Sequence, residues 1–497
     1  MEVLAAVVGW AIQMITRSSP ANGVLIDAQN LTERLSSGAQ VYRPGSTGFK
    51  DATIRWSSND VPTFRLVVTP SVENDVAEII KYANDLNIPY LAVTGGHGAI
   101  TTVGNVHQGI GIWMNGLDSV EIAPDKSKVT IGGGALSKSV TDALWAVGKQ
   151  TVTGICECTS ILGPGLGGGH GALQGRYGLV SDQFVAMNVV LANGTMITVN
   201  EKQHADLWWA MRGAGHNFGI VTSVSAKIYD VQEPNWAYES FIYTGDKVAG
   251  VFETINSNFP NGSQPVDVLT LVLFVNNHDV DPTKPLVAFY VLQEGVLEVD
   301  PIYTTPFRQL GPIMTTPGTG PYTDIPSWIG EDNASPSCMK AGLVNIRFPI
   351  DLEVYNATAM QSAYELFAAT TQEYPALNNS AFLFEGYSLQ AVKAVDSASS
   401  AFPFRQDNYL VSPLLIYLPD GPELDETAVN FGKDLRQILY VGSQREELHT
   451  YVNYAFGDET TQNWYGYEQW RQHRLSALKK TYDPMGKFSF YAPIGTH

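Results

Sequence analysis

The chain has few cysteines, few basic residues and no long hydrophobic run. Its 497 residues include three cysteines, and 30 lysines and arginines stand against 49 aspartates and glutamates, which gives a net charge of −19. Three cysteines are too few for a disulfide framework, and Cys156 and Cys158 cannot easily pair across the single residue between them. The Cys-Glu-Cys sequence also lacks the second cysteine pair and the histidines of a zinc site. At least one thiol is therefore free, and no metal site is expected.

The shortage of basic residues limits the partners of the protein. Nucleic acids and anionic lipids are bound through clustered lysine and arginine, and the sequence contains no such cluster. The apolar run from Val3 to Ile15 is too short to cross a bilayer. It has the length of a signal-peptide core, but Glu2 stands where a basic residue is usual, so the compartment is left open. Six N-x-S/T sequons, compatible with secretion but also expected by chance, occur at Asn30, Asn193, Asn261, Asn333, Asn356 and Asn378.

A glycine-rich stretch from Thr151 to Gly178 is the most unusual part of the chain. We expect no ordinary helix or strand to run through it, and its unshielded backbone suits the wall of a cofactor site. A glycine-rich surface loop is the alternative. The segment Gly163 to Gly167 resembles a dinucleotide fingerprint, but the spacing is wrong and Pro164 interrupts it. A Rossmann nicotinamide site is therefore not expected.

The elements before the glycine-rich stretch predict an α+β module. Residues 65–69 have strand composition, and residues 71–83 show helical periodicity with Ser71 as the candidate N-cap. A buried strand over residues 90–93 then leads into the turn Thr94-Gly95-Gly96-His97-Gly98. This order of strand, helix, strand and glycine turn places a histidine at the end of a strand.

Since 497 residues are more than one hydrophobic core usually contains, two or more domains are expected.

Further elements are predicted on the other side of the glycine-rich stretch. Strands over residues 184–191 and 196–199, joined at Asn193-Gly194, form a β-hairpin. A boundary follows near residue 232, and the segment beyond it contains strands and a helix over residues 356–371. Met360, Tyr364 and Phe367 lie on one face of that helix, and such a stripe is expected to be core.

Five motifs, spread from Thr94 to Phe488, together resemble one protein family. They are TGGH at 94–97, GxC at 154–156, GGGHG with RYG at 167–178, DLWWAMRGAGHNFGIVTS at 206–223, and YVNY with KKTYDPMGKF near the C-terminus. The chain resembles the berberine bridge enzyme-like branch of the vanillyl-alcohol oxidase and p-cresol methylhydroxylase flavoproteins. The resemblance implies an α+β fold with a two-lobed, PCMH-type FAD-binding domain and a substrate domain built on an antiparallel sheet backed by helices.

The resemblance also suggests where the domains divide. Residues 1–59 form an N-terminal segment, residues 60–232 the FAD-binding domain, residues 233–440 the substrate domain, and residues 441–497 a segment that returns to the FAD-binding lobe.

By this resemblance FAD is bonded twice, through His97 to the flavin 8α position and through Cys156 to flavin C6. Neutral imidazole and thiolate are both nucleophiles that can add to the electron-poor ring. Cys156 has the family's distance to the triple glycine, although Cys158 remains an alternative. Cys158 and Cys338 are expected to be structural thiols.

The remaining cofactor contacts follow from the same resemblance. Backbone amides and hydroxyls for the pyrophosphate are expected at Gly95, Gly96, Gly98, Gly133, Thr101 and Thr102. Ile220 and Val221 are expected against the adenine, and Asn453 near the isoalloxazine, although plain strand packing is the alternative. Thr159 falls where the family has a small residue that controls access of oxygen, and threonine there favours an oxidase.

The catalytic base is expected to be a tyrosine. The positions that carry a lysine or glutamine in many plant members correspond to Val411 and Pro413, so that base is missing. Tyr451 is expected as the base, with Tyr177 as support, because a phenol can take a proton when its neighbours lower its pKa. Core packing is the alternative for both tyrosines.

These residues predict an FAD-dependent oxidase that passes a hydride to flavin N5 and electrons to O2, giving H2O2. The expected partners are O2 and a small organic substrate of the specialised-metabolite class, and the sequence leaves the oligomeric state open. Three alternatives remain: an oligosaccharide or sugar alcohol oxidase of the same fold, a flavoprotein that mainly shapes a cyclisation, and a carbohydrate-binding protein without flavin.

Overall fold

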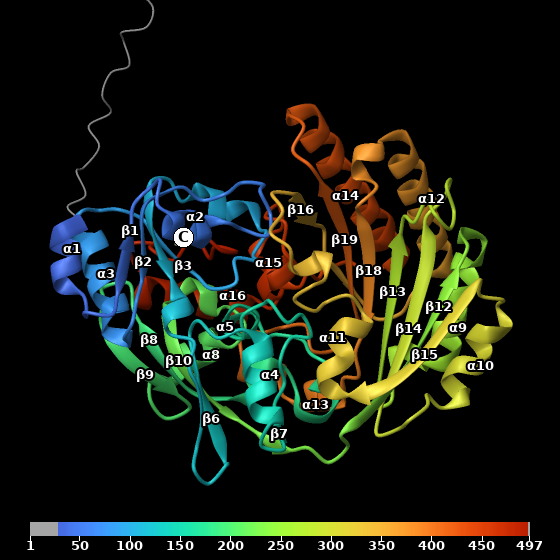
Figure 1. The fold of residues 1–497 in the computed structure, drawn as a ribbon, viewed down its shortest axis with the longest axis horizontal. Coiled ribbons are helices and arrows are strands. Elements are labelled where there is room, and N and C mark those ends of the chain that lie inside the picture. The colour runs from blue at the N-terminus through green and yellow to red at the C-terminus, as the bar shows by residue number, and fades with distance from the viewer. Residues whose placement is uncertain (1–27, 496–497) are drawn as a thin grey trace, which may run out of the picture.

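The computed structural model describes residues 28–495, which fold into two lobes that lie side by side (Figure 1). The first lobe contains two sheets from the N-terminal half together with the last helices of the chain. The second contains one large sheet and its covering helices. Within residues 28–495, no helix combines the length and the apolar character needed to cross a bilayer. The apolar run Val3 to Ile15 lies outside the described residues.

A four-stranded sheet opens the first lobe. Its order is β1-β2-β4-β3, in which β2, β4 and β3 are parallel and β1 is an antiparallel edge. The bounds are β1 Gln40–Tyr42, β2 Phe64–Thr69, β3 Tyr90–Val93 and β4 Gly109–Trp113. Helix α3 (Glu73–Asp85) connects β2 to β3, so the predicted strand-helix-strand module is confirmed. The expected Ser71 cap is wrong, because the Asp75 carboxylate accepts the backbone N–H groups of Ser71 and Val72 at 2.9 and 3.0 Å.

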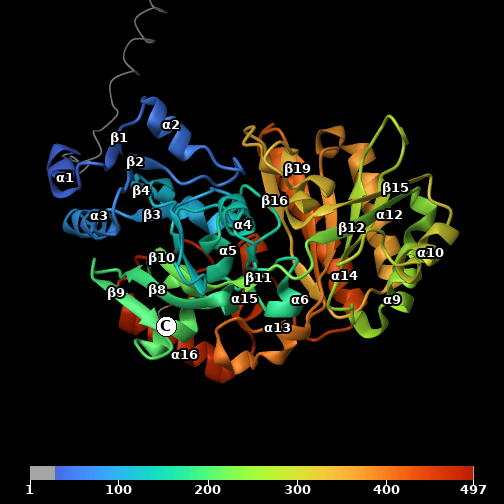
Figure 2. The same cartoon turned by 60° about the horizontal axis from the view of Figure 1, so that its bottom comes forward.

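An antiparallel five-stranded sheet forms the second layer of this lobe, below the first sheet in Figure 2. Its order is β5-β6-β10-β8-β9. The bounds are β5 Val120–Ile122, β6 Lys128–Gly132, β8 Phe184–Val190, β9 Met196–Asn200 and β10 Ile220–Lys227. The predicted hairpin at Asn193-Gly194 is confirmed as β8 and β9, with Val190 opposite Met196. A short ribbon of β7 (Lys149–Gln150) and β11 (Tyr229–Asp230) adjoins it.

The second lobe is an antiparallel sheet of eight strands, all contained within residues 235–417. Seven follow the order β15-β12-β14-β13-β18-β19-β16, and β17 also pairs with β19. The bounds are β12 Asn235–Tyr243, β13 Val268–Val275, β14 Leu286–Glu294, β15 Met314–Pro321, β16 Val344–Arg347, β17 Ile350–Leu352, β18 Ala381–Gly386 and β19 Tyr409–Tyr417.

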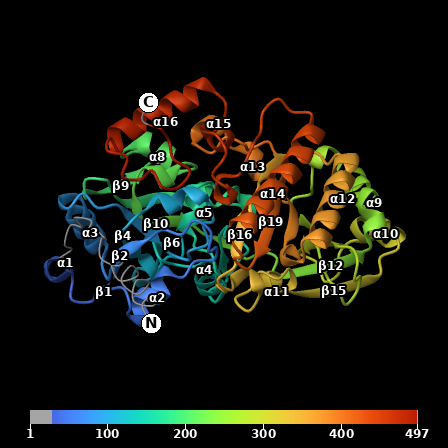
Figure 3. The same ribbon diagram turned by 90° about the horizontal axis from the view of Figure 1, so that it is seen from above.

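Helices cover one face of this sheet. Figure 3 shows α12 beside α14, and α14 contacts β19. The covering helices are α9 Val248–Asn258, α10 Pro301–Gln309, α12 Ala357–Glu373 and α14 Pro422–Ser443. Met360, Tyr364 and Phe367 on α12 are buried in the core between helices and sheet, as expected. This arrangement confirms the predicted antiparallel sheet backed by helices.

Strand β18 shows which side chains lie on each of the two faces of the sheet. Side chains alternate along a strand, so Phe382 and Phe384 enter the core under the helices. Leu383 and Glu385 therefore point to the opposite face, which looks toward the first lobe and lines a cavity there. The strand thus places a carboxyl group on the inner face of the sheet, beside the cavity.

The C-terminal segment returns to the first lobe, where α16 (Gln469–Tyr482) lies against α8 (Ala205–Met211). The same neighbours lie together in Figures 1 and 3. The buried Asn217 side chain joins this segment to the lobe, because its Nδ2 donates to Ala492 O at 3.1 Å and its Oδ1 accepts from Ile494 N at 2.9 Å. Residues more than 270 positions apart therefore complete one core.

The glycine-rich stretch contains two short helices, α5 (Leu162–Leu166) and α6 (Gln174–Tyr177). The expectation that no ordinary helix crosses it holds only for longer elements, since a single turn needs few hydrogen bonds. The other short helices are α1 Ala28–Arg34, α2 Thr47–Thr53, α4 Ser137–Trp145, α7 Val180–Gln183, α11 Ile325–Trp328, α13 Gln390–Ala394 and α15 Thr461–Tyr465.

A disulfide joins Cys158 to Cys338 with an S–S distance of 1.99 Å. Both cysteines were expected to be structural thiols, and the structure joins them in a bond that the sequence did not predict. Pairing brings together residues 180 positions apart, a proximity that cysteine number and local spacing do not reveal. The bond ties the glycine-rich stretch to a segment of the second lobe, and Cys156 is left as the free cysteine.

Candidate active site

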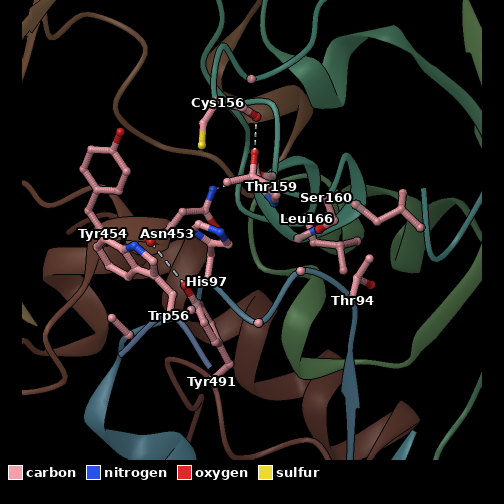
Figure 4. Close-up of a pocket in the computed structure, with 18 of the residues that line it drawn as sticks. Trp56, Thr94, His97, Cys156, Thr159, Ser160, Leu166, Asn453, Tyr454 and Tyr491 are labelled. Atoms are coloured by element: carbon pink, nitrogen blue, oxygen red, sulfur yellow. Dashed lines mark hydrogen bonds between the residues drawn. The ribbon is translucent and has the colours of Figure 1, made fainter. Parts of the chain in front are cut away.

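A cavity of about 400 Å³ lies between the two lobes (Figure 4). One wall comes from the first lobe, with the turn after β3, the start of the glycine-rich stretch and the start of β10. The facing wall is the inner face of the large sheet, and residues near 451–455 and 487–491 close the space. Such a volume, with mixed apolar and polar lining, is typical of a site for a cofactor and a small substrate.

The turn after β3 allows no side chain at its first glycines. A Cβ on Gly95 would lie 2.8 Å from Cys158 O, and Gly96 has a φ of +69°, which favours glycine. A Cβ on Gly133, at the end of β6, would lie 2.5 Å from Val221 O. The backbone is therefore packed tightly behind the turn, and the exposed edge of Gly95 to Gly98 faces the cavity.

His97 projects from this turn into the cavity, where its ring stacks on Trp56 at a centroid distance of 5.5 Å. Its Nε2 is buried and has no hydrogen-bond partner. Burial, together with the positive charges of Lys340, Arg347 and Arg55, lowers the pKa of His97 to about 3. The imidazole is therefore neutral at physiological pH, and a neutral ring has the lone pair that a nucleophile requires.

Cys156 supplies a free thiol on the same cavity. Its Sγ lies 3.4 Å from the Sγ of Cys158 and 3.7 Å from the Sγ of Cys338. Because Cys158 is consumed in the disulfide, Cys156 is the thiol available to a bound ring. Burial, and then the neighbouring Glu331 carboxylate, raise the pKa of the Cys156 thiol, so it needs a base to become a thiolate.

Most of the glycine-rich stretch does not face the cavity. Gly154 and Gly163 line it, but the triple glycine is buried against protein. A Cβ on Gly167 would lie 2.3 Å from Asn453 Oδ1, and a Cβ on Gly168 would lie 2.5 Å from the Phe402 ring. Of the stretch expected to form the cofactor wall, only the first part lines the cavity, so the expectation stays a prediction for that part alone. The remainder lets segments of the chain approach closely.

The structure brings most of the predicted cofactor residues to the cavity. Besides His97 and Cys156, the lining includes Gly95, Gly96, Gly98, Gly133, Thr159, Ile220, Val221, Tyr451 and Asn453. Thr159 Oγ1 donates to Cys156 O at 3.0 Å, which fixes the backbone of the cysteine loop. Asn453 Nδ2 donates to Pro164 O at 2.9 Å and to the Tyr451 hydroxyl at 2.7 Å.

Three predicted residues lie elsewhere. Thr101 donates its backbone N–H to Phe456 O at 2.8 Å, and the Thr102 hydroxyl donates to Phe490 O at 3.0 Å. Both threonines therefore hold the C-terminal segment, and neither lines the cavity. Tyr177 is stacked on Tyr229 at 3.8 Å between centroids and is likewise absent from the cavity lining. The geometry thus gives these three side chains packing roles.

Tyr451 and Tyr454 both reach the cavity, but only Tyr454 has an acidic partner. The Tyr454 hydroxyl donates to Glu385 Oε1 at 2.9 Å, and the Tyr387 hydroxyl donates to Glu385 Oε2 at 2.7 Å. Tyr451 packs its ring against His170 at 4.8 Å. Burial raises the pKa of Glu385, so this carboxyl is poised to take a proton in a solvent-poor site.

Sequence reasoning missed both Glu385 and Tyr454, and named Tyr451 as the base with Tyr177 as support. A signal was present, because Glu385 is the single charged residue in the apolar run Phe382-Leu383-Phe384-Glu385-Gly386. On the next strand, Val411 belongs to the core under the helices, whereas Leu414 lines the cavity. That strand thus offers no ionisable group to the cavity, as the sequence suggested.

Three positively charged side chains lie near the Gly95 to Gly98 turn or near the Glu385 carboxylate. Arg55 donates to Gly98 O at 2.5 Å, and Lys340 Nζ lies 3.6 Å from the position of a Cβ on Gly96. Arg347, at the end of β16, lies over the Tyr454 ring with its Cζ 4.2 Å from the centroid. These charges make the cavity locally positive in a chain whose net charge is −19.

Comparison with known proteins gives agreement at the levels of sequence and fold. A family model described as an FAD binding domain matches residues 64–200. The FAD-linked oxidoreductase chyH of Penicillium rubens is 48% identical over 99% of both chains. The structure of Physcomitrella patens BBE-like 1 is 19% identical, with a TM-score of 0.80 over 95% of this chain and 99% of that one. The structure of glucooligosaccharide oxidase from Acremonium strictum, a protein described with a 6-S-cysteinyl, 8α-N1-histidyl FAD, is 17% identical, with a TM-score of 0.77 over 94% of this chain and 99% of that one.

Proposed function

The chain belongs to the FAD-linked oxidoreductases, and from this premise we propose that it is an oxidase with doubly attached FAD that acts on a small organic substrate and O2. The observation that carries the proposal is the convergence of two free nucleophiles on one cavity. His97 offers a buried, unpartnered Nε2, and Cys156 offers the free thiol. The attachments named for glucooligosaccharide oxidase use the same two residue types.

The residues fit an FAD held along the cavity. The backbone of Gly95, Gly96, Gly98 and Gly133 would hold the pyrophosphate, where Arg55 and Lys340 would add positive charge. Ile220 and Val221 would pack against the adenine, and Asn453 would lie near the isoalloxazine. Glu331 is placed to take the thiol proton of Cys156 as the sulfur is attached. When bound, the flavin accepts a hydride from the substrate and passes two electrons to O2.

Proton transfer is the task of the chain's own side chains. A hydroxyl proton of the substrate passes to Tyr454 Oη while the proton of Tyr454 passes to Glu385 Oε1, and the carbon loses its hydride to form a carbonyl. The carboxylate partner makes Tyr454 a better base than Tyr451, which the sequence favoured. We propose that Tyr451 and its hydrogen bond from Asn453 orient the site. Thr159, a small residue beside Cys156, leaves room for O2.

The lining of the cavity suits a largely apolar metabolite better than an oligosaccharide. Much of the wall contributed by the second lobe is apolar, with Leu269, Leu271, Leu273, Leu383 and Leu414. A sugar needs many hydrogen-bonding partners, whereas this face offers few. We therefore infer a specialised metabolite with one oxidisable C–H bond, bound mainly by its apolar surface. We also propose that the domains of the chain end at residues 59, 232 and 440, as expected from the sequence.

Acid denaturation of the purified protein tests the attachments. Yellow colour is expected to stay with the precipitated chain, and peptide mass analysis is expected to find flavin on the peptides that contain His97 and Cys156. Colour in the supernatant would remove both proposed bonds. A screen for H2O2 release with alcohols and oligosaccharides distinguishes the two substrate classes. Product formation without O2 uptake would instead favour a cyclisation catalyst.

A further inference from the structure

Arg347 lies half-buried at the cavity and has no anionic partner among the described residues, whereas several other arginines do. Arg405 is held by Asp182 at 2.9 Å, Arg436 by Glu459 at 3.0 Å, and Arg471 by Glu468 at 3.1 Å. No ion pair within 4.0 Å is found for Arg347 among residues 28–495, and its Nη1 is buried without a hydrogen-bond partner. A buried guanidinium N–H that no acceptor satisfies is unfavourable unless a ligand supplies the acceptor.

The guanidinium is held in place by aromatic rings. Its Cζ lies 4.2 Å from the centroid of Tyr454 and 5.5 Å from that of Trp56. These contacts hold the charge beside the cavity without using the planar fork of N–H donors. Such a fork matches the two oxygens of a carboxylate. Arg347 is thus oriented for an anion that is not part of the described chain.

The position of Arg347 identifies which molecule carries that anion. Lys340 and Arg55 flank the Gly95 to Gly98 turn, where the pyrophosphate of FAD is expected. Arg347 contacts Trp56, which stacks on His97 of this turn. It lies closer to the ring of Tyr454, whose hydroxyl is bonded to Glu385. An anion on Arg347 would therefore lie next to the groups that take the substrate proton.

We propose that Arg347 binds a carboxylate of the substrate, so that the enzyme oxidises a small organic acid at a carbon close to that carboxylate. This inference rests on the proposed oxidase function and narrows it to one substrate class. Arg347 then determines specificity: it selects a charged substrate for a cavity whose other wall is apolar. The arginine also fixes which carbon lies beside Tyr454.

Binding of matched probes to the holoenzyme tests the proposal without knowledge of the substrate. Benzoate and benzamide have the same shape and differ in charge, and either one bound near the flavin changes its absorbance spectrum. Wild-type protein is expected to bind benzoate at least tenfold more tightly than benzamide. Arg347→Met should remove this preference with little effect on benzamide, and Arg347→Lys should keep part of it. Arg308→Met, at an exposed arginine outside the cavity, should leave the preference unchanged.

Several outcomes would overturn the assignment. Equal affinity for the two probes in the wild type, no binding of benzoate, or an unchanged preference in Arg347→Met would each exclude a carboxylate subsite at this residue. Loss of FAD from Arg347→Met and Arg347→Lys alike would show that the arginine serves the cofactor. Reoxidation of dithionite-reduced holoenzyme by O2, with H2O2 measured, tests the oxidase function separately from the anion site.

Discussion

The hydroxyl of Tyr454 lies 2.9 Å from Glu385 Oε1, although the two residues come from different lobes and are 69 positions apart. Glu385 lies on the inner face of β18, and Tyr454 lies in the C-terminal segment that returns to the first lobe. A phenol beside a buried carboxylate provides a route for a proton out of the cavity. This pair is the part of the proposed mechanism that variants can test most directly.

Glu385→Gln should slow substrate oxidation while leaving the fold and the flavin in place. The amide can accept the Tyr454 hydrogen bond but cannot take its proton, so the rate of flavin reduction should fall by roughly 100- to 10,000-fold. Anaerobic stopped-flow measurement of flavin bleaching, with a substrate found in the H2O2 screen, gives this rate. A Gln variant with wild-type reduction would show that the carboxylate is not the proton acceptor.

Tyr454→Phe and Tyr451→Phe distinguish the two candidate tyrosines. We expect the Tyr454 variant to show the same loss as Glu385→Gln, because both interrupt one proton path. The Tyr451 variant should lose about tenfold or less, as expected of an orienting group. The same stopped-flow assay serves for both, and the double variant Tyr454→Phe with Glu385→Gln should be little worse than either single one. A larger loss at Tyr451 would restore the base predicted from sequence.

The pH dependence of flavin reduction should report Glu385. Burial raises the pKa of this carboxyl above its usual value, and only the deprotonated form accepts a proton. The rate should therefore rise with pH through an apparent pKa above that of an exposed glutamate, and then level off. Glu385→Gln should lack this rise. A rise that persists in the Gln variant would belong to another group.

The disulfide should determine which cysteine bonds the flavin. Cys338→Ser frees Cys158, whose sulfur is 3.4 Å from that of Cys156, so peptide mapping should find flavin on a mixture of the two residues. Loss of a cross-link across 180 residues should also lower stability by about 2–5 kcal/mol. Cys156→Ala is the matched control, since it keeps the disulfide and should lose only the C6 bond. Attachment solely at Cys156 in Cys338→Ser would contradict this expectation.

Asp351→Asn should change how stability depends on pH. Burial, and then the charge of Asp407, raise the pKa of Asp351 to about 8, while His449 and Arg445 oppose the shift. The native state then holds a proton that the unfolded chain releases near pH 4, so wild-type stability falls as pH rises from about 4 to 8, by at most about 1.4 kcal/mol per unit. The Asn variant should lack this decline and be the more stable protein at pH 8.

Urea unfolding at several pH values measures the effect, with the exposed Asp279→Asn as control. Parallel pH profiles for wild type and Asp351→Asn would mean that Asp351 is ionised in the native protein.

Local pattern was sufficient to predict much of the fold. Periodicity gave α3 and α12, and Asn193-Gly194 gave the β8–β9 hairpin, because neighbouring residues determine these features. The capping of α3 was not predicted correctly, because the side chain of Asp75 reaches back along the chain and accepts a hydrogen bond from the backbone N–H of Ser71. Pairings between distant residues, such as Cys158 with Cys338, left no trace in local sequence.

The sequence predicted those residues of the candidate site that stand in recognisable motifs. His97 and Cys156 stand in short glycine-rich motifs, and both line the cavity. Glu385 and Arg347 lie on strands of the second lobe, and their importance arises from the face that each strand presents. Thr101, Thr102 and Tyr177 were placed by motif alone, and their neighbours prove to be other parts of the protein.

The cavity is completed by residues from nearly the whole chain. Arg55 and Trp56 line it on one side, and Phe488 and Tyr491 on another, close to the point where Asn217 fastens the last described residues. During synthesis, the ribosome must therefore release almost the entire polypeptide before the pocket has all its walls. A nascent chain cut short before residue 488 would lack part of the cavity lining.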